Sequence, residues 1–429
     1  MIQTIDLREA RPTRIELAEL IPRAGMDVAA ASAAASELIN DVRNRGEEAL
    51  LDQAERLDGI RPPRIRVHPD DIGVAVRAAL DESIDRLTRA SRAQLPQPSV
   101  TDLGPGAQVI QRWEPVERVG LYVPGGKAVY PSSVLMNVVP AHVAGVASIA
   151  LASPAQKEFN GSVHPTILGA AGLLGVDEIY AMGGAGAIGA LAYGVSAIDL
   201  DPVQVITGPG NVYVAAAKRL VRGVVGIDSE AGPTEILIIA DDAADAQVVA
   251  ADLVSQAEHD ELASAILVTD SPALANRVIA ELAKLTSRTR HSDRVAIALA
   301  GSQSAIVLVA DLEAAAAFSN AYGPEHLEIQ TAEPGSVLDG ITNAGAIFLG
   351  ANSPVSLGDY LAGSNHVLPT GGQSRFSSGL GSYTFVRPQQ IINYDRAALK
   401  AVEREVLALS DAEDLPAHGE AISARFRDQ

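Results

Sequence analysis

The stretch VGLYVPGGKAVYPSSVLMNVVPAHVAGVASIALAS (residues 119–153) decides the fold. It begins with a short β-rich run, passes a glycine turn, continues as an apolar helical segment and ends in a second β-rich run. A strand, a helix and another strand in this order are typical of one unit of a parallel sheet. The low aromatic content, 4%, and the abundance of Ala, Val, Leu and Ile suit helices packed on such a sheet.

The same alternation continues along the chain and then begins again. The first series adds β-rich runs at residues 178–182 and 203–207. The second series has β-rich runs at residues 235–241, 264–270, 304–311, 327–331 and 346–350, again separated by helical stretches. Two such series predict an α/β fold with two Rossmann-like, doubly wound units. We expect the first unit at residues 106–230 and the second at residues 231–380.

The two ends of the chain differ from this pattern. Residues 1–105 are rich in Ala, Arg and Glu at helical spacing and predict an N-terminal helical region. After the Gly- and Ser-rich passage at residues 371–382, residues 381–429 predict a mainly helical C-terminal tail. A chain of 429 residues is too long for one simple core, so several domains are expected.

Composition excludes several classes of protein. A net charge of −20 disfavours binding to nucleic acid and to anionic membrane surfaces. No apolar run approaches the roughly 18 residues of a membrane span, and the first residues, MIQTIDLREARPTR, lack the apolar segment of a signal peptide. We therefore expect a cytoplasmic protein. Any phosphate-bearing ligand must be held by local backbone donors.

A metal site is one interpretation of four polar residues. Gln256 and His259 are three positions apart on a predicted helix and would share a face. Asp359 and His418 are further candidate ligands, and because the chain has no cysteine, ligation must be by nitrogen and oxygen. A histidine on a helix is also compatible with an ordinary core or surface position.

Two neighbouring residues suit acid–base chemistry. Glu325 and His326 precede the β-rich run at 327–331, which places them at a loop edge where a sheet presents its ligands. Imidazole is the best general base near neutral pH, and an adjacent carboxylate can orient water. A helix-capping glutamate and a structural histidine remain the alternative. His366, in AGSNHVLP, is a further acid–base or substrate-binding candidate.

Three glycine turns follow predicted strands of the first series, at residues 121–126, 183–189 and 207–211. Glycine lets the backbone approach a ligand, and the helix that follows offers free N–H donors to phosphate. Turns between strands and helices also need glycine for purely structural reasons. No acidic residue stands clearly where it would bind the ribose of a dinucleotide, so the sequence does not discriminate NAD from NADP.

Five motifs together resemble those of histidinol dehydrogenases, in the same order. They are AGPTE (231–235), SQAEHDE (255–261), GPEHLEI (323–329), SLGDYLAGSNHVLPT (356–370) and EDLPAHGEA (413–421). The resemblance runs from about residue 121 almost to the end of the chain. It implies two incomplete Rossmann-like domains, a homodimer, and the use of zinc and NAD to oxidise L-histidinol through L-histidinal to L-histidine.

The resemblance also implies roles for individual residues. His326 would take the hydroxyl proton, and Glu325 would activate water. One zinc ion per subunit would be held by four residues that also bind substrate: Gln256, His259, Asp359 and His418. Thr234, Glu413 and His326 would contact substrate as well. Glu413 and His418, in the tail, would complete the active site of the partner subunit.

The cofactor NAD would contact Tyr122, Gly186 and Asn211. The family loop is commonly GGAQAI, and this chain has Gly186 in place of the glutamine, so one side-chain contact to NAD would be missing. We therefore expect that Gly186→Gln would tighten NAD binding. Without cysteine, aldehyde oxidation would have to proceed through a hydrated aldehyde and not through a thiohemiacetal.

Three alternatives fit parts of the pattern. A dehydrogenase of the same family could act on another small alcohol, such as a sulfonated diol. A zinc hydrolase would use Glu325 as its base, with structural glycine turns, and a non-catalytic metal-binding scaffold would need no acid–base residues. Glu413 and His418 favour histidinol, because a carboxylate and an imidazole in the tail suit a cationic amine and an imidazole ring.

Overall fold

The computed structural model describes residues 2–10, 12–23, 28–69, 73–125, 129–230 and 232–426. The chain divides into two compact units, which we describe separately. Unit 1 consists of Met1–Gln94 and Val116–Phe385, and unit 2 of Leu95–Pro115 and Val386–Gln429. Among the described residues, no helix combines the length and apolar character needed to cross a bilayer.

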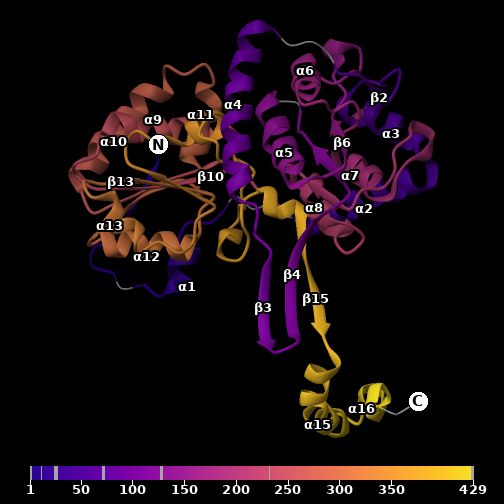
Figure 1. Ribbon diagram of the computed structural model, residues 1–429. Helices are drawn as coiled ribbons and strands as arrows, with labels where there is room; N and C mark the ends of the chain where they lie inside the picture. Colours follow the sequence, from indigo (N-terminus) through magenta and orange to yellow (C-terminus); the bar gives the residue numbers. More distant parts are fainter. Residues whose placement is uncertain are drawn as a thin grey trace. The chain divides into compact units, whose positions relative to one another are not determined.

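The first sheet of unit 1 is a Rossmann-like sheet with the strand order β2-β7-β6-β5-β8-β9. Figure 1 labels two of its strands, β2 and β6. Its strands are β2 (Arg66–Val67), β5 (Arg118–Tyr122), β6 (Ser148–Ser153), β7 (Ile179–Ala181), β8 (Val205–Thr207) and β9 (Gly226–Ile227). All neighbours are parallel except β2 and β7. The helices between the strands are α5 (Pro131–Ala144), α6 (Pro165–Leu173), α7 (Gly184–Tyr193) and α8 (Val212–Val221).

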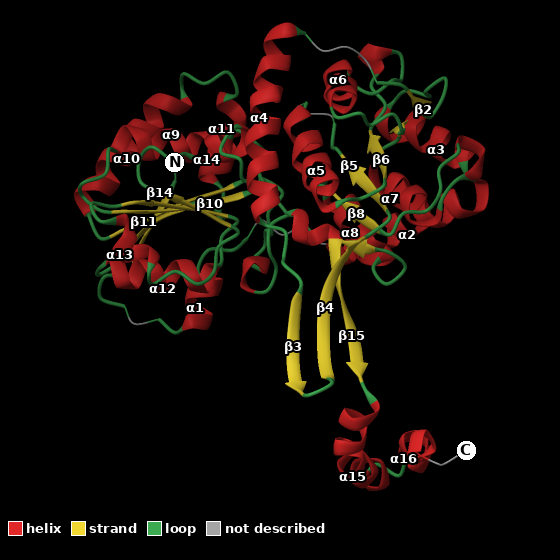
Figure 2. Ribbon diagram, in the orientation of Figure 1, coloured by secondary structure: helices red, strands yellow, loops and turns green. Residues whose placement is uncertain are grey.

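The second sheet of unit 1 repeats this topology with the order β1-β12-β11-β10-β13-β14, and all its neighbours are parallel. The strands are β1 (Gln3–Asp6), β10 (Glu235–Ala240), β11 (Ser264–Thr269), β12 (Ala305–Leu308), β13 (His326–Gln330) and β14 (Ala346–Leu349). Helices cover both faces (Figure 2). They are α1 (Arg14–Glu19), α9 (Ala246–Ala257), α10 (Pro272–Thr286), α11 (Ser292–Ala300), α12 (Leu312–Tyr322), α13 (Pro334–Leu338) and α14 (Val355–Tyr360).

The predicted α/β fold with two Rossmann-like sheets is therefore confirmed. Central strands such as β10 and β11 are buried along their whole length, as expected for a parallel sheet covered on both faces. The strand order also fixes where ligands meet the first sheet. Its connections reverse direction between β5 and β8, and the carboxyl ends of these strands form the usual crevice for a dinucleotide.

Residues 1–105 are distributed over several parts of the structure and do not form the separate helical region that the sequence suggested. Strand β1 extends the second sheet, whereas α2 (Val28–Arg45) and α3 (Glu47–Gln53) pack with the first sheet. Ala31, Ala35, Ile39 and Val42 of α2 share a core with residues of α7 and α8. The small side chains let the helices approach closely and bury apolar surface. Helix α4 (Val74–Ala93) completes unit 1.

Unit 2 joins two distant segments through an antiparallel sheet with the order β15-β4-β3. Its strands are β3 (Ser99–Gly104), β4 (Ala107–Pro115) and β15 (Val386–Tyr394), followed by α15 (Arg396–Ala412) and α16 (Pro416–Ser423). The expected helical tail is thus half of a small α+β unit whose other half is residues 95–115. Pairing between β4 and β15 is a long-range contact, so the local pattern of the tail did not reveal it.

Candidate functional site

The candidate acid–base residues lie at the amino ends of β10 and β13. These two strands are parallel neighbours with Ile236 opposite His326, so Glu235 and Glu325, one residue earlier, lie side by side. From the sequence, we expected the pair at the edge of the sheet where ligands usually bind. In open α/β sheets that edge is formed by the carboxyl ends of the strands. The structure places the pair at the opposite, amino-terminal edge of the second sheet.

Glu325 is buried and held by two hydrogen bonds. Thr234 Oγ1 donates to Glu325 Oε2 at 2.7 Å, and the backbone N–H of Glu235 donates to the same oxygen at 2.8 Å. Burial raises the pKa of Glu325 well above its ordinary value, although both hydrogen bonds act in the opposite direction. A carboxyl group with a raised pKa is a better proton acceptor when it is ionised and is matched to chemistry nearer neutral pH.

His326 is positioned by the main chain. Its Nδ1 lies 2.9 Å from the carbonyl oxygen of Glu235, which only accepts, so Nδ1 carries the hydrogen and Nε2 has the lone pair. Burial lowers the pKa of His326. The ring is therefore neutral near pH 7 and ready to accept a proton. Nδ1 also lies 3.5 Å from Glu325 Oε2, which brings the two predicted catalytic groups together.

Gln256 connects the acid–base pair to the candidate metal ligands. Its Nε2 donates to Thr234 Oγ1 at 2.5 Å, which continues the chain of hydrogen bonds that ends at Glu325. The Oε1 atom of Gln256 is buried and has no hydrogen-bond partner within the described chain. A buried acceptor without a partner is costly unless a ligand satisfies it.

His259 lies just beyond α9, and not on the helix as the spacing suggested, because the helix ends at Ala257. A turn still keeps it next to Gln256, since the His259 N–H donates to the Gln256 carbonyl oxygen at 3.2 Å. His259 Nε2 is 4.0 Å from Asp359 Oδ2. Burial lowers the pKa of His259, and the charge of Asp359 opposes this shift. Within the described ranges, no three His, Asp or Glu residues form a preassembled metal site.

His366 joins the two Rossmann-like halves of unit 1. Its Nδ1 lies 3.1 Å from the carbonyl oxygen of Asp359, and its Nε2 lies 3.0 Å from the hydroxyl of Ser133 on α5. The carbonyl requires a hydrogen on Nδ1, so Nε2 accepts the Ser133 hydroxyl hydrogen. Both ring nitrogens are thus engaged, and burial lowers the pKa of His366. These contacts join His366 to the Asp359 backbone and to α5, and an acid–base or substrate-binding role for His366 stays a prediction.

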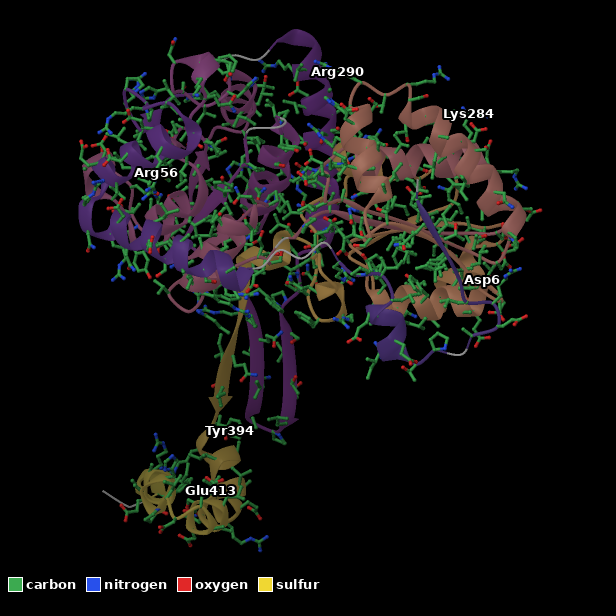
Figure 3. All side chains as sticks on the ribbon, turned by 180° about the vertical axis from the view of Figure 1, so that it is seen from behind. Asp6, Arg56, Lys284, Arg290, Tyr394 and Glu413 are labelled. Carbon is green, nitrogen blue, oxygen red and sulfur yellow. The ribbon has the colours of Figure 1, made fainter. Side chains whose placement is uncertain are left out.

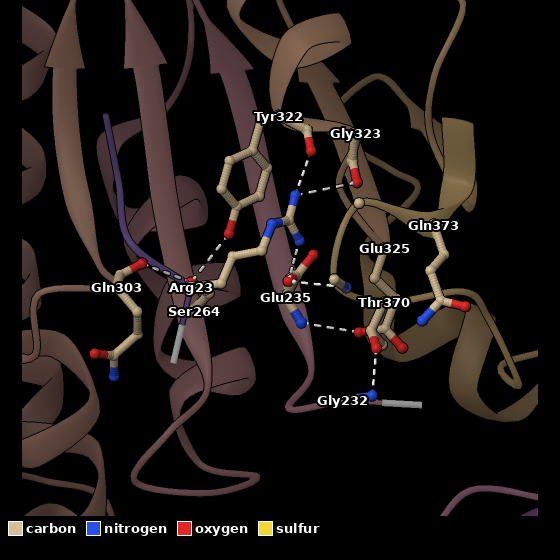
Figure 4. A network of polar contacts seen from close by, with 12 residues as sticks. Arg23, Gly232, Glu235, Ser264, Gln303, Tyr322, Gly323, Glu325, Thr370 and Gln373 are labelled. Atoms are coloured by element: carbon tan, nitrogen blue, oxygen red, sulfur yellow. Dashed lines mark hydrogen bonds and ion pairs between the residues drawn. The ribbon is translucent and has the colours of Figure 1, made fainter. Parts of the chain in front are cut away.

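A network around Glu235 escaped the sequence analysis (Figure 4). Arg23 forms an ion pair with Glu235, donates to the carbonyl oxygen of Tyr322, and stacks 3.9 Å above the centre of the Tyr322 ring. Glu235 Oε1 also accepts from the Gly371 N–H at 3.2 Å. One signal was available: Glu235 is a carboxylate at the start of an otherwise apolar buried strand. No local pattern links it to Arg23, 212 residues away.

Two of the three candidate cofactor residues, Tyr122 and Asn211, line a cavity of about 940 Å³ at the other sheet. Tyr122, at the end of β5, accepts a hydrogen bond from the Gly184 N–H at 3.1 Å, and burial raises its pKa to about 12. Asn211 caps α8 by accepting from the N–H groups of Tyr213 and Val214. Both residues line the cavity together with Gly183 and Gly184.

Two of the three glycine turns are fully described, whereas the first includes Gly126, which lies outside the described residues. In the turn after β8, Gly208 has φ of +115°, and a β-carbon there would meet the Tyr122 carbonyl oxygen at 1.9 Å. Only glycine fits this position. Lys218 and Asp228, a buried ion pair, bind the Gly208 carbonyl and N–H groups respectively and fix the turn.

Gly186 lies in the first turn of α7 and is buried. A β-carbon at this position would lie 2.0 Å from Oε1 of Gln53. The amide of Gln53, on α3, thus fills the space that a side chain at position 186 would enter. A glutamine at position 186 could therefore enter only if the end of the Gln53 side chain moved aside, and the expected gain in NAD binding stays a prediction.

Glu413 and His418 are exposed residues of unit 2, whereas the other candidates belong to unit 1. Figure 3 labels Glu413 near the end of the chain. Glu413 caps the C-terminal end of α15, and His418 lies in α16. The described chain therefore does not assemble all the predicted metal ligands in one unit.

Comparison with known proteins agrees with these features. A family model for histidinol dehydrogenase matches residues 21–426. Histidinol dehydrogenase of Leifsonia xyli subsp. xyli is 66% identical over 435 residues and 100% of both chains, and that of Thermobifida fusca is 57% identical over 95% of this chain and 94% of that protein. The crystal structure of histidinol dehydrogenase from Elizabethkingia anophelis has a TM-score of 0.92 and 31% identity, covering 99% of this chain and 98% of that chain. The chain belongs to the histidinol dehydrogenase family.

Proposed function

We propose that Glu325 and His326 carry out the proton transfers in the oxidation of L-histidinol to L-histidine. Enzymes of this family are NAD- and zinc-dependent oxidoreductases of histidine biosynthesis. The reaction removes two hydrides from one carbon, first from the alcohol and then from the hydrated aldehyde. The observation that carries the proposal is the 3.5 Å approach of a neutral imidazole and a carboxyl group at one buried edge.

His326 would serve as the base in both oxidation steps. Its Nε2 has the lone pair because Nδ1 is committed to the Glu235 carbonyl oxygen. As a hydride leaves the alcohol carbon, Nε2 would accept the hydroxyl proton, and the backbone contact would hold the ring during the transfer. Burial excludes water that would compete for the proton.

Glu325 would activate the water that hydrates the aldehyde. The donors Thr234 Oγ1 and Glu235 N–H both bind Oε2, which leaves Oε1 for a water molecule. The raised pKa of Glu325 makes its carboxylate a stronger base, so it can take a proton from water as the aldehyde is attacked. This route requires no cysteine, in keeping with the composition of the chain.

Zinc would be held by Gln256, His259 and Asp359 with His418 of the partner subunit, one ion per subunit. The residues present fit this ion: Gln256 Oε1 is a buried acceptor without a partner in the described chain, and the donors are all nitrogen and oxygen. When bound, zinc would supply a Lewis acid that holds the amine and imidazole of the substrate. The hydroxyl of Thr234 bridges Gln256 and Glu325, so Thr234 would hold the zinc ligand and the base in fixed positions relative to each other.

A homodimer is part of the proposal, because unit 2 carries Glu413 and His418 but has little core of its own. Its buried residues within the described chain are four small ones: Ala107, Ala398, Ser410 and Gly419. Large apolar side chains on the same unit are exposed, including Val100 at 59% and Ile392 at 72%. Such surface is typical of an interface. We place the enzyme in the cytoplasm, where its co-substrate NAD is held.

NAD would bind in the 940 Å³ cavity beside Tyr122 and Asn211. The glycine turn before α7 brings the main chain close to this cavity, as dinucleotide binding requires.

Product stoichiometry tests the proposal. Purified enzyme with L-histidinol and excess NAD should form two NADH per histidinol consumed. His326→Asn removes the basic Nε2 and should lower kcat by roughly 10²- to 10⁴-fold. Exposed His68→Asn, by contrast, should behave as the wild-type enzyme. A yield of one NADH with histidinal accumulating, or an active His326→Asn variant, would contradict it.

A further inference from the structure

The wall of the cofactor cavity is built partly by the N-terminal segment, in which the sequence showed no chemistry. Gln53 of α3 and Asp58 of the π-helical turn η1 (Ala54–Asp58) line the cavity. Asp58 is followed by Gly59 with φ of +72°, a left-handed conformation that ends the turn. A β-carbon at Gly59 would meet the end of the Lys157 side chain, with Nζ at 2.5 Å, so this lysine lies beside the turn.

The carboxylate of Asp58 faces the glycine turn between β7 and α7. A β-carbon placed on Gly183 would lie 3.4 Å from Asp58 Oδ2. Gly183 is the N-cap of α7 and has no side chain to bond the helix terminus. Asp58 is also close enough to Tyr122 for its charge to raise the pKa of that phenol. A ligand passing over this turn would therefore meet a carboxylate.

The Asp58 carboxylate has no compensating partner in the described part of the chain. It is half-buried and makes no hydrogen bond or ion pair there. Burial alone raises its pKa, to about 6. A desolvated carboxylate without donors is costly, and a ligand with two adjacent hydroxyl groups would supply the missing donors.

We propose that Asp58 binds the 2′- and 3′-hydroxyl groups of the adenosine ribose and selects a cofactor that lacks a 2′-phosphate. This inference rests on the proposed function, in which the cavity holds NAD. In many Rossmann-like enzymes an acidic residue follows the glycine loop in sequence and performs this task. Here the residue would come from a segment more than 120 positions before the loop at residues 183–189.

The charged side chains that line the cavity also favour NAD over NADP. Four acidic and two basic residues line it: Glu37, Asp41, Asp58 and Glu158, with Arg56 and Lys157. Asp41 is itself paired with Arg45, outside this lining. A phosphate on the ribose would add negative charge beside Asp58, and repulsion at short range in a partly buried site is strong. NADP should therefore bind far more weakly than NAD.

The test compares NAD and NADP in wild-type enzyme, Asp58→Asn and Asp58→Ser. Binding is measured by calorimetry without substrate, and kcat and KM are measured with L-histidinol. We expect Asp58→Asn to weaken NAD binding roughly tenfold or more and to narrow the preference for NAD over NADP by roughly ten- to a hundredfold. The KM for histidinol should stay the same. Both variants remove an uncompensated charge, and thermal unfolding checks that they fold.

Glu37→Gln is the matched control, because it removes one negative charge from the same cavity at an exposed position on α2. It should narrow the preference for NAD over NADP much less than Asp58→Asn does, because it removes a charge of the lining without removing the proposed contact with the ribose. Equal effects of Glu37→Gln and Asp58→Asn, or an unchanged preference in both Asp58 variants, would overturn the proposal.

Tyr122→Phe separates this inference from the placement of NAD. If Tyr122→Phe weakens NAD binding while the Asp58 variants do not, only the role of Asp58 is wrong. If none of these variants changes NAD binding, the cofactor binds elsewhere and the underlying function proposal fails at that point too.

Discussion

At Gly186, the structure adds a neighbour that the family pattern does not show, the side chain of Gln53. From the sequence, the glycine at position 186 replaces the glutamine of the family loop, which implies that one side-chain contact to NAD is missing. In the structure, the Gln53 amide fills the space, with Nε2 donating to the Leu38 carbonyl oxygen at 3.1 Å and to Asp41 at 3.4 Å. Its Oε1 is buried without a partner in the described chain. The glycine and the glutamine thus belong together as a packed pair.

From this packing, we predict instead that Gly186→Gln destabilises the protein and raises the KM for NAD. The new side chain must displace Gln53, and overpacking of this kind costs about 1–3 kcal/mol, partly offset by the gain of about 0.5–1 kcal/mol when glycine leaves a helix. Chemical denaturation gives the change in unfolding free energy. Combining Gly186→Gln with Gln53→Ala should recover much of the loss. A single variant as stable as the wild type would refute the packing argument.

At the scale of elements, α14 shows how a short helix is held in place. It spans six residues and has no side-chain cap of its own, yet it carries Asp359. Glu328 on β13 takes the place of the missing cap. Its Oε1 accepts a hydrogen bond from the N–H of Val355, the first residue of α14, at 2.9 Å. Asp252 on α9 lies nearby, and both carboxylates receive hydrogen bonds from Gln330 Nε2. A strand and a helix thus position a candidate zinc ligand.

The same cluster predicts a pH effect on stability. Burial, followed by the charge of Asp252, raises the pKa of Glu328 to about 8. Unfolded, Glu328 releases its proton near pH 4.5, so between about 4.5 and 8 the folded state binds more protons and stability falls as pH rises. Glu328→Gln should remove this slope and gain stability relative to the wild type at pH 8.

Thermal unfolding from pH 5 to 9 checks this prediction, with Glu333→Gln as an exposed control. The neutral amide still offers an oxygen to Val355, and Gln330 can turn to present its unused Oε1. A variant with the same pH dependence as the wild type would show that Glu328 is not the group responsible.

At the scale of the whole molecule, the division into two units separates residues that the proposed zinc and substrate site would bring together. Gln256, His259 and Asp359 are in unit 1, whereas Glu413 and His418 are in unit 2. A two-fold dimer in which unit 2 serves the neighbouring subunit would assemble the site twice. This arrangement would also cover the exposed apolar side chains of unit 2.

Mixed dimers test this arrangement. Inactive His259→Ala and inactive His418→Ala chains, unfolded together and reassembled, should pair at random. About half of the dimers are then mixed, and each has one intact site, so activity should return to about a quarter of wild type. Mass spectrometry verifies the mixed species. If all ligands came from one chain, every site would keep a defect and activity would stay absent.

The sequence by itself determined the two Rossmann-like sheets, because buried parallel strands and their helices leave local patterns of apolar residues and glycine turns. It also named Glu325, His326, Gln256 and Asp359, which the structure brings to one region. Each of these residues stands in a short motif, and such a motif can be recognised from adjacent positions alone.

Only the tertiary structure decided which distant segments meet. Arg23 reaches Glu235, Gln53 fills the space at Gly186, and Asp58 faces the turn at Gly183. Each of these partners comes from the N-terminal segment, whose local pattern indicated only helices. Contacts between segments far apart in the chain are set by packing of whole elements, which no short stretch of sequence records.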